Sequence, residues 1–127
     1  MSVHVAVEQN DVAKLKTLLA AHAAVYQPDN NGHTPLGIAC HQGHGDCVQL
    51  LLAAHAAVDQ PDNNGSTPLY IACGHGHGDC VQLLLAAHAA VDQPNNEGLT
   101  PLYVACNEEQ GDCVQLLLAA HATVNQP

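Results

Sequence analysis

The chain repeats one segment at a constant spacing, and no other feature of the sequence constrains its fold as strongly. The tripeptide Thr-Pro-Leu begins at Thr34, Thr67 and Thr100. Residues 30–62 and 63–95 align without a gap and are identical at 28 of 33 positions. The differences are His33/Ser66, Gly37/Tyr70, His41/Gly74, Gln42/His75 and Asp62/Asn95. With a degenerate first copy, this pattern predicts one domain, residues 1–127, made of four stacked units: 1–29, 30–62, 63–95 and 96–127.

Each unit begins with signals for a turn and a first helix. In the second unit, Asn31-Gly32 indicates a tight turn, because both residue types tolerate positive φ. Thr34 is then expected to cap a helix with Pro35 at its first position, where the missing N–H costs nothing. This helix is predicted to end at about Cys40. The equivalent residues of later units are Asn64-Gly65, Thr67, Pro68 and Cys73, followed by Thr100, Pro101 and Cys106.

A second helix follows in each unit. Gly43 separates it from the first helix, and Asp46 places a carboxylate at the positive end of the new helix dipole. The run Val-Gln-Leu-Leu-Leu-Ala-Ala then leads to His55, where the helix is predicted to end before Pro61. The matching starts and ends are Asp79 and His88 in the third unit, and Asp112 and His121 in the fourth.

A turn followed by two antiparallel helices, repeated at this spacing, resembles the ankyrin repeat, and the resemblance covers essentially the whole chain. It rests on Gly65-Ser66-Thr67-Pro68-Leu69-Tyr70-Ile71-Ala72-Cys73, Gly76-His77, Val81-Gln82-Leu83-Leu84-Leu85 and Ala89. The resemblance implies an all-α solenoid of helix-turn-helix units joined by β-turn or hairpin loops. It also implies that a partner protein is bound on the concave side, by turn tips and first-helix faces.

The sequence departs from the family pattern at three places. Gly37, Tyr70 and Tyr103 replace the His that usually follows Thr-Pro-Leu, so the usual hydrogen bond of that His to the threonine is expected to be lost or altered. A histidine replaces the glycine that usually ends the second helix. Glu109-Gln110 replaces Gly-His in the last unit, where a distorted connection is expected.

The candidate binding residues are those that vary between units at the tips and on the first helices. Tyr70 and Tyr103 are the expected anchors, since a half-exposed tyrosine offers a large rigid contact area with a polar end. The alternative is that these tyrosines pack between units and that the variation is drift. The full predicted ladder is His33, Ser66 and Leu99 at the tips, then Gly37, Tyr70 and Tyr103, then His41, Gly74 and Asn107, with Gln42, His75 and Glu108 behind.

The net charge of −10 restricts the choice of partner. Lys14 and Lys16 are the only cations, so nucleic acid and anionic membranes are unsuitable partners, because binding to them relies on Lys and Arg. A basic protein surface is expected instead. The alternative is that the acidity only keeps the protein soluble.

The N-terminus lacks the pattern of a secretory signal, and apolar runs such as Leu50 to Ala54 are too short to span a bilayer. An intracellular, reducing setting and free thiols for the six cysteines are therefore expected. The last unit has an internal-looking second helix, Val114 to Ala120, without polar replacements. Its apolar face is a candidate site for self-association.

There are three alternatives to protein binding: metal binding, catalysis and a scaffold without a native partner. Ten His and six Cys suggest a metal site, formed by Cys40, His41, His44 and Cys47 or by Cys73, His75, His77 and Cys80. Those cysteines also fit small buried core positions, so neither a metal nor another cofactor is predicted. Catalysis is not expected, because the sequence has no nucleophile elbow, phosphate-binding glycine loop or metalloprotease helix. The near-identity of the central units also fits a consensus-type or designed scaffold without a native partner, although the cysteines and the irregular first unit favour a natural gene.

Overall fold

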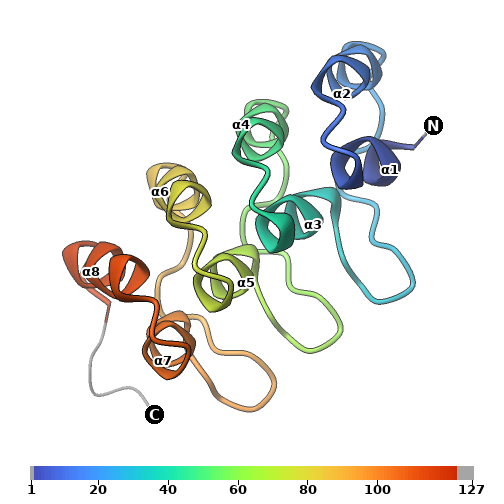
Figure 1. Cartoon of the computed structure of the whole chain (residues 1–127). Coiled ribbons are helices and arrows are strands. Elements are labelled where there is room, and N and C mark those ends of the chain that lie inside the picture. Colours follow the sequence, from blue (N-terminus) through green and yellow to red (C-terminus); the bar gives the residue numbers. More distant parts are fainter. Residues whose placement is uncertain (1, 123–127) are drawn as a thin grey trace.

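Eight helices form four stacked helix-turn-helix pairs in residues 2–122, the part of the chain that the computed structural model describes (Figure 1). The pairs follow one another in chain order, and the loops that join them project to one side. No β-strand occurs within these residues. The helices are α1 (Val3–Glu8), α2 (Val12–Ala20), α3 (Pro35–Gln42), α4 (Gly45–Ala53), α5 (Pro68–Gly74), α6 (Gly78–Ala86), α7 (Pro101–Asn107) and α8 (Gly111–Ala119).

Threonine caps start the first helices of units two to four, as the sequence predicted. The hydroxyl oxygen of Thr34 accepts a hydrogen bond from the backbone N–H of Gly37 at 3.1 Å, and Thr67 does the same for Tyr70 at 3.2 Å. The threonines are buried, so this bond also satisfies a hydroxyl removed from water. The helix α3 extends to Gln42, beyond the predicted end at Cys40, because Gly43, with φ of +73°, supplies the left-handed backbone that terminates it.

The loop tips are tight turns whose geometry differs in one respect from the sequence prediction. At the tip that leads into the second unit, the N–H of Asp29 donates to the carbonyl of His33, and the N–H of Gly32 donates to the carbonyl of Asp29. Gly32 has φ of +80°, whereas Asn31 is not among the residues with positive φ, so only the glycine supplies left-handed backbone. The Asp29 carboxylate accepts two further backbone N–H bonds, from Asn31 and His33, and these bonds replace a left-handed asparagine in fixing the turn.

The second helices end slightly before the predicted residue. The helix α4 ends at Ala53, and His55 follows in the left-handed region with φ of +66°. The N–H of Ala56 then bonds to the carbonyl of Leu51 at 3.0 Å, which closes the helix end. The same left-handed histidine occurs in the other units: His22, His88 and His121.

The connection before α8 is not distorted, contrary to the sequence expectation. Glu109 takes the left-handed backbone with φ of +58°, close to the +72° of Gly76 in the preceding unit. Gln110 has φ of −92° and ψ of 77°, which match the −88° and 78° of His77. Packing of the unit therefore imposes the same path on a sequence that lacks glycine at this position.

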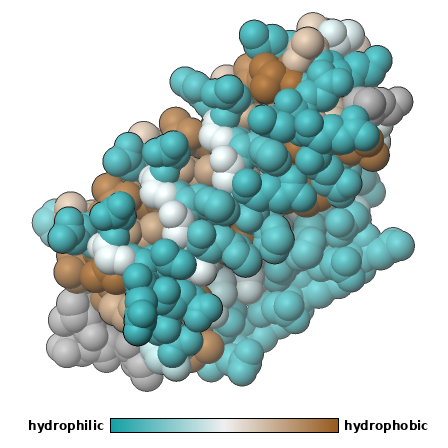
Figure 2. Space-filling view, viewed as in Figure 1, coloured by the Kyte–Doolittle hydropathy of each residue, from teal (hydrophilic) through white to brown (hydrophobic). Residues whose placement is uncertain are grey.

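The core lies between neighbouring units and is made of small aliphatic side chains. Each first helix packs on the next first helix, and each second helix on the next second helix. One leucine of each second helix is completely buried, at Leu15, Leu51, Leu84 and Leu117. Hydrophilic side chains cover the side of the loops, whereas hydrophobic patches appear along the row of second helices (Figure 2). Within residues 2–122, none of the helices combines the length and the apolar character needed to span a membrane.

Candidate functional site

A groove of about 570 Å³ runs between the loop tips and the row of first helices. Its apolar floor is formed by Ile38, Ile71 and Val104, which occupy the same position in three successive units. Gly37 and Gly74 also line it. Since Tyr70 stands in the third unit where Gly37 stands in the second, the missing side chain of Gly37 leaves space there.

Most of the predicted ladder lines this groove. Nine of the twelve residues do so: His33, Gly37, His41, Gln42, Ser66, Tyr70, Gly74, His75 and Glu108. Leu99, Tyr103 and Asn107 of the last unit are not part of its lining. Tyr103 is nevertheless 44% exposed, while Tyr70 is half-buried and beside the groove floor. The predicted ladder and the groove therefore overlap, with the last unit contributing less to the groove than expected.

Seven further lining residues were absent from the prediction: Glu8, Asp29, Asn31, Ile38, Asp62, Ile71 and Val104. The prediction selected positions that vary between units two and three, and most of these residues lie at positions that hardly vary. The floor could have been predicted from the repeat, because Ile38, Ile71 and Val104 are equivalent residues of three units. Each directly follows a residue of the predicted ladder: Gly37, Tyr70 or Tyr103.

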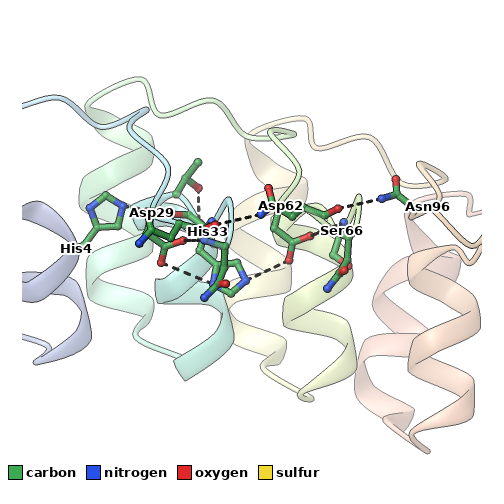
Figure 3. Close-up of polar contacts among 12 residues, drawn as sticks. His4, Asp29, His33, Asp62, Ser66 and Asn96 are labelled. Carbon is green, nitrogen blue, oxygen red and sulfur yellow. Dashed lines mark hydrogen bonds and ion pairs between the residues drawn. The ribbon is translucent and has the colours of Figure 1, made fainter.

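Polar contacts connect the loop tips across unit boundaries (Figure 3). The side chain of His33 lies between two carboxylates, with Nε2 3.3 Å from Asp62 Oδ2 and Nδ1 4.0 Å from Asp29 Oδ2. The Asp62 side chain is only 8% exposed, and its carboxylate also accepts the N–H groups of Asn64 and Ser66. The pKa of Asp29 is lowered: burial opposes this, but hydrogen bonds from the His33 and Asn31 N–H groups outweigh it. The tips are thus anionic and held in register.

The side-chain and backbone amides of asparagine continue this register along the stack. The N–H of Asn63 bonds to the carbonyl of Asn31 at 3.2 Å, and that of Asn96 to Asn64 at 3.0 Å. The side-chain amide of Asn96 also donates to the carbonyl of Asn63 at 3.1 Å. The loops of units two to four are therefore fixed to one another, and their tips form a continuous edge.

The groove carries negative charge and no lysine or arginine. Glu8, Asp29, Asp62 and Glu108 all line it, whereas the chain's two cations, Lys14 and Lys16, lie on α2. The pKa of Tyr70 is raised, first by burial and then by the neighbouring Glu97, Tyr103 and Glu108. Tyr70 therefore stays a neutral phenol at this end of the groove, beside the carboxylates of Glu97 and Glu108.

A cluster of imidazoles occupies the helix side of the groove. The rings of His41 and His75 have centroids 4.3 Å apart, and His77 Nε2 is 3.1 Å from the carbonyl oxygen of His41. The pKa of His75 is lowered by burial, then by His41 and His77, while Glu108 acts in the opposite direction. The ring of His75 is therefore predominantly neutral at pH 7 and gains positive charge in acid.

The histidines and cysteines of the two motifs considered for metal binding are directed to different partners. Cys40 contacts Cys80 of the next unit, and this hydrogen bond together with burial holds the pKa of the Cys40 thiol well above its usual range. The Cys47 thiol donates to Asn10 Oδ1 at 3.5 Å, and His44 Nε2 lies 2.9 Å from Gln42 Oε1. Among residues 2–122, no group of three or more His, Cys, Asp or Glu side chains is placed to hold a metal ion. These thiols pack as small core side chains.

Comparison with known proteins assigns the chain to a family. Residues 3–94 and 58–127 match a family model described as ankyrin repeats in three copies. No curated protein matches the chain significantly. Ankyrin repeats are in general protein-interaction modules and typically have no enzymatic activity. The matches together cover residues 3–127 and agree with the stacked helix pairs, so the chain belongs to the ankyrin-repeat family.

Proposed function

We propose that this protein binds a partner protein on the groove formed by its loop tips and first helices. The observation that carries the proposal is the position of the sequence differences. Units two and three are identical at 28 of 33 positions, and the first four of their five differences fall on residues that line the groove. The core positions of the same units do not vary. Variation confined to one surface of a repeated scaffold is what distinct contacts with one ligand require.

Tyr70 and Tyr103 are proposed as the anchors of the interaction. Tyr70 lines the groove, and Tyr103 presents 44% of its surface to solvent in the next unit. Tyrosine gives much contact area for little loss of rotamer entropy, because only two side-chain torsions have to be fixed. Residues of this kind commonly carry a large share of binding free energy.

Truncation of the two tyrosines tests the proposal. The partner would first be captured from a lysate by the immobilised chain and identified, and its affinity would then be measured by titration calorimetry. The double variant Tyr70→Ala/Tyr103→Ala should lose about 2 kcal/mol or more of binding free energy, or roughly thirtyfold in Kd. Tyr26→Ala is the matched control, because Tyr26 is 50% exposed but does not line the groove. Unchanged affinity of a folded double variant would exclude this surface.

Three finer points belong to the same proposal. The partner surface is proposed to be basic, because the groove contains four carboxylates and no lysine or arginine. An intracellular, reducing setting is proposed because the six cysteines are free and oxidising compartments favour disulfides. Self-association through the last unit is supported by Leu118, an apolar side chain of α8 that is 43% exposed. Light scattering of the wild type and of Leu118→Gln tests this self-association. The molecular mass should rise with protein concentration only for the wild type.

A further inference from the structure

We propose that the element of the partner that enters the groove is an extended basic segment of about nine residues. Its apolar side chains would contact the isoleucine and valine floor, and its lysines or arginines would pair with carboxylates on both sides. This inference rests on the proposed function but goes further, since a folded basic surface would satisfy the proposed function equally well. It stands on three observations: the shape of the groove, its charge, and the space at Gly37.

The length of the groove favours an elongated ligand over a small molecule. The floor residues Ile38, Ile71 and Val104 lie on α3, α5 and α7, so the groove crosses successive units. Packed helices lie about 8–10 Å apart, so four units extend over roughly 30 Å. An extended segment covers this length in about nine residues at about 3.3 Å each. Alternate side chains of such a segment would point to the floor.

The charge favours lysine or arginine at the remaining positions. Glu8 and Asp29 stand at the N-terminal end of the groove, Asp62 near its middle and Glu108 at its C-terminal end. Glu8 and Glu108 are exposed, whereas the Asp62 side chain is only 8% exposed and is held by its hydrogen bonds. Asp62 is already bonded to His33, Asn64 and Ser66, so it adds a fixed negative potential in the middle of the groove. The exposed carboxylates of Glu8 and Glu108 are the ones placed for direct ion pairs with a partner's cations.

The space at Gly37 provides a way to block the groove without disturbing the fold. A Cβ atom added at Gly37 would meet only Thr34 Oγ1 at 3.6 Å and Ile71 Cδ1 at 3.9 Å, which are ordinary contacts. Gly37 lies within α3 and is not among the glycines with positive φ. Tyrosine is therefore tolerated there, as it is at the equivalent Tyr70, and its ring would occupy the groove.

The experiment uses a labelled peptide of about ten residues that alternates Lys and Val, and a second peptide with Glu in place of Lys. Binding to the full chain is measured by fluorescence anisotropy at about pH 7.5, where carboxylates and lysines are charged. The lysine peptide should bind, and the glutamate peptide should not. Gly37→Tyr should abolish the binding, and Glu8→Gln/Glu108→Gln should weaken it about fivefold to tenfold, as expected for two exposed ion pairs. Circular dichroism verifies the fold of each variant.

The control separates groove binding from general attraction to an acidic protein. Asp112→Asn removes one charge from the first turn of α8, outside the groove, and should change the affinity less than about twofold. Equal weakening by Asp112→Asn and Glu8→Gln/Glu108→Gln, or binding that survives Gly37→Tyr, would overturn the inference. So would equal binding of the two peptides. If neither peptide binds while Tyr70→Ala/Tyr103→Ala still weakens the captured partner, only this inference fails and the proposed function stands.

Discussion

Glu109 adopts a left-handed backbone conformation that glycine adopts more easily. Its φ of +58° lies in the left-handed region, where a Cβ atom costs about 1 kcal/mol or more, and the equivalent residues Gly43 and Gly76 avoid this cost. Glu109→Gly should therefore raise the free energy of unfolding by about 0.5–1 kcal/mol in urea denaturation. The adjacent Glu108→Gly is the control, because Glu108 has φ of −91° and glycine there only adds flexibility to the unfolded chain. Equal effects of the two variants would contradict the strain assigned to Glu109.

The imidazole of His75 should make stability depend on pH. Its folded-state pKa is lowered by burial, His41 and His77, against the influence of Glu108, so the unfolded chain binds this proton more readily. The contribution of neutral His75 to the free energy of unfolding is therefore fully present above the pKa of the unfolded chain, about 6.5. It is lost as the pH falls through the lower pKa of the folded protein. His75→Gln, which copies Gln42 of the second unit, should lose less stability than the wild type when urea denaturation is compared between about pH 7.5 and 5.

The titration itself can be followed by NMR of the imidazole ring protons. The His75 signal should titrate below its ordinary range, and Glu108→Gln should lower its pKa further, because the carboxylate is the neighbour that favours the charged ring. A His75 pKa that rises in Glu108→Gln, or that lies above about 6.5 in the wild type, would show that this cluster is arranged differently.

At the scale of the helix, the sequence predicts starts better than ends. The threonine and proline that begin α3, α5 and α7 act within one turn, so their effect is visible in a few neighbouring letters. The end of α4 at Ala53 carries no such signal: the left-handed His55 is followed by the backbone bond from the Ala56 N–H to the Leu51 carbonyl. The loop of the preceding unit also contacts this end, because the Tyr26 hydroxyl donates to the His55 carbonyl. For the same reason, the contact of Cys40 with Cys80 could not be predicted, because Cys80 is the repeat equivalent of Cys47 and not of Cys40.

The second helices should contribute most of their stability through one leucine each. Leu84 of α6 is completely buried, and truncation removes its contacts and leaves a cavity. Leu84→Ala is expected to cost about 2–5 kcal/mol of unfolding free energy in urea. Leu118→Ala in α8 should cost less than about 1 kcal/mol, because Leu118 is 43% exposed. A loss below about 0.5 kcal/mol for Leu84→Ala would mean that the core lies elsewhere.

At the scale of the whole molecule, stability is shared because units contact their sequence neighbours. The helices α5 and α6 pack on α3 and α4 of the unit before and on α7 and α8 of the unit after. In such a linear array, the stability of each unit includes its interfaces, and strong interfaces make the array unfold together. The shape of the groove also depends on the interfaces between units, because its floor has one residue from each of three units. A partner that bridges those units would stabilise all of them.

The buried thiols can report whether the units unfold together. Cys106 is exposed and should react rapidly with a maleimide in the folded protein. The variant Cys106→Ser removes this reaction and serves as the parent protein for the experiment. In that background, Cys47 of the second unit and Cys113 of the fourth are buried and should be labelled only after opening. Leu84→Ala weakens the third unit between them. We expect the labelling of both thiols, followed by mass spectrometry of their peptides, to rise at the same, lowered urea concentration. If Cys113 is labelled at a clearly lower urea concentration than Cys47, the weakened third unit no longer couples the second unit to the fourth. The loop tips would then hold one fixed register only while every interface between units is intact.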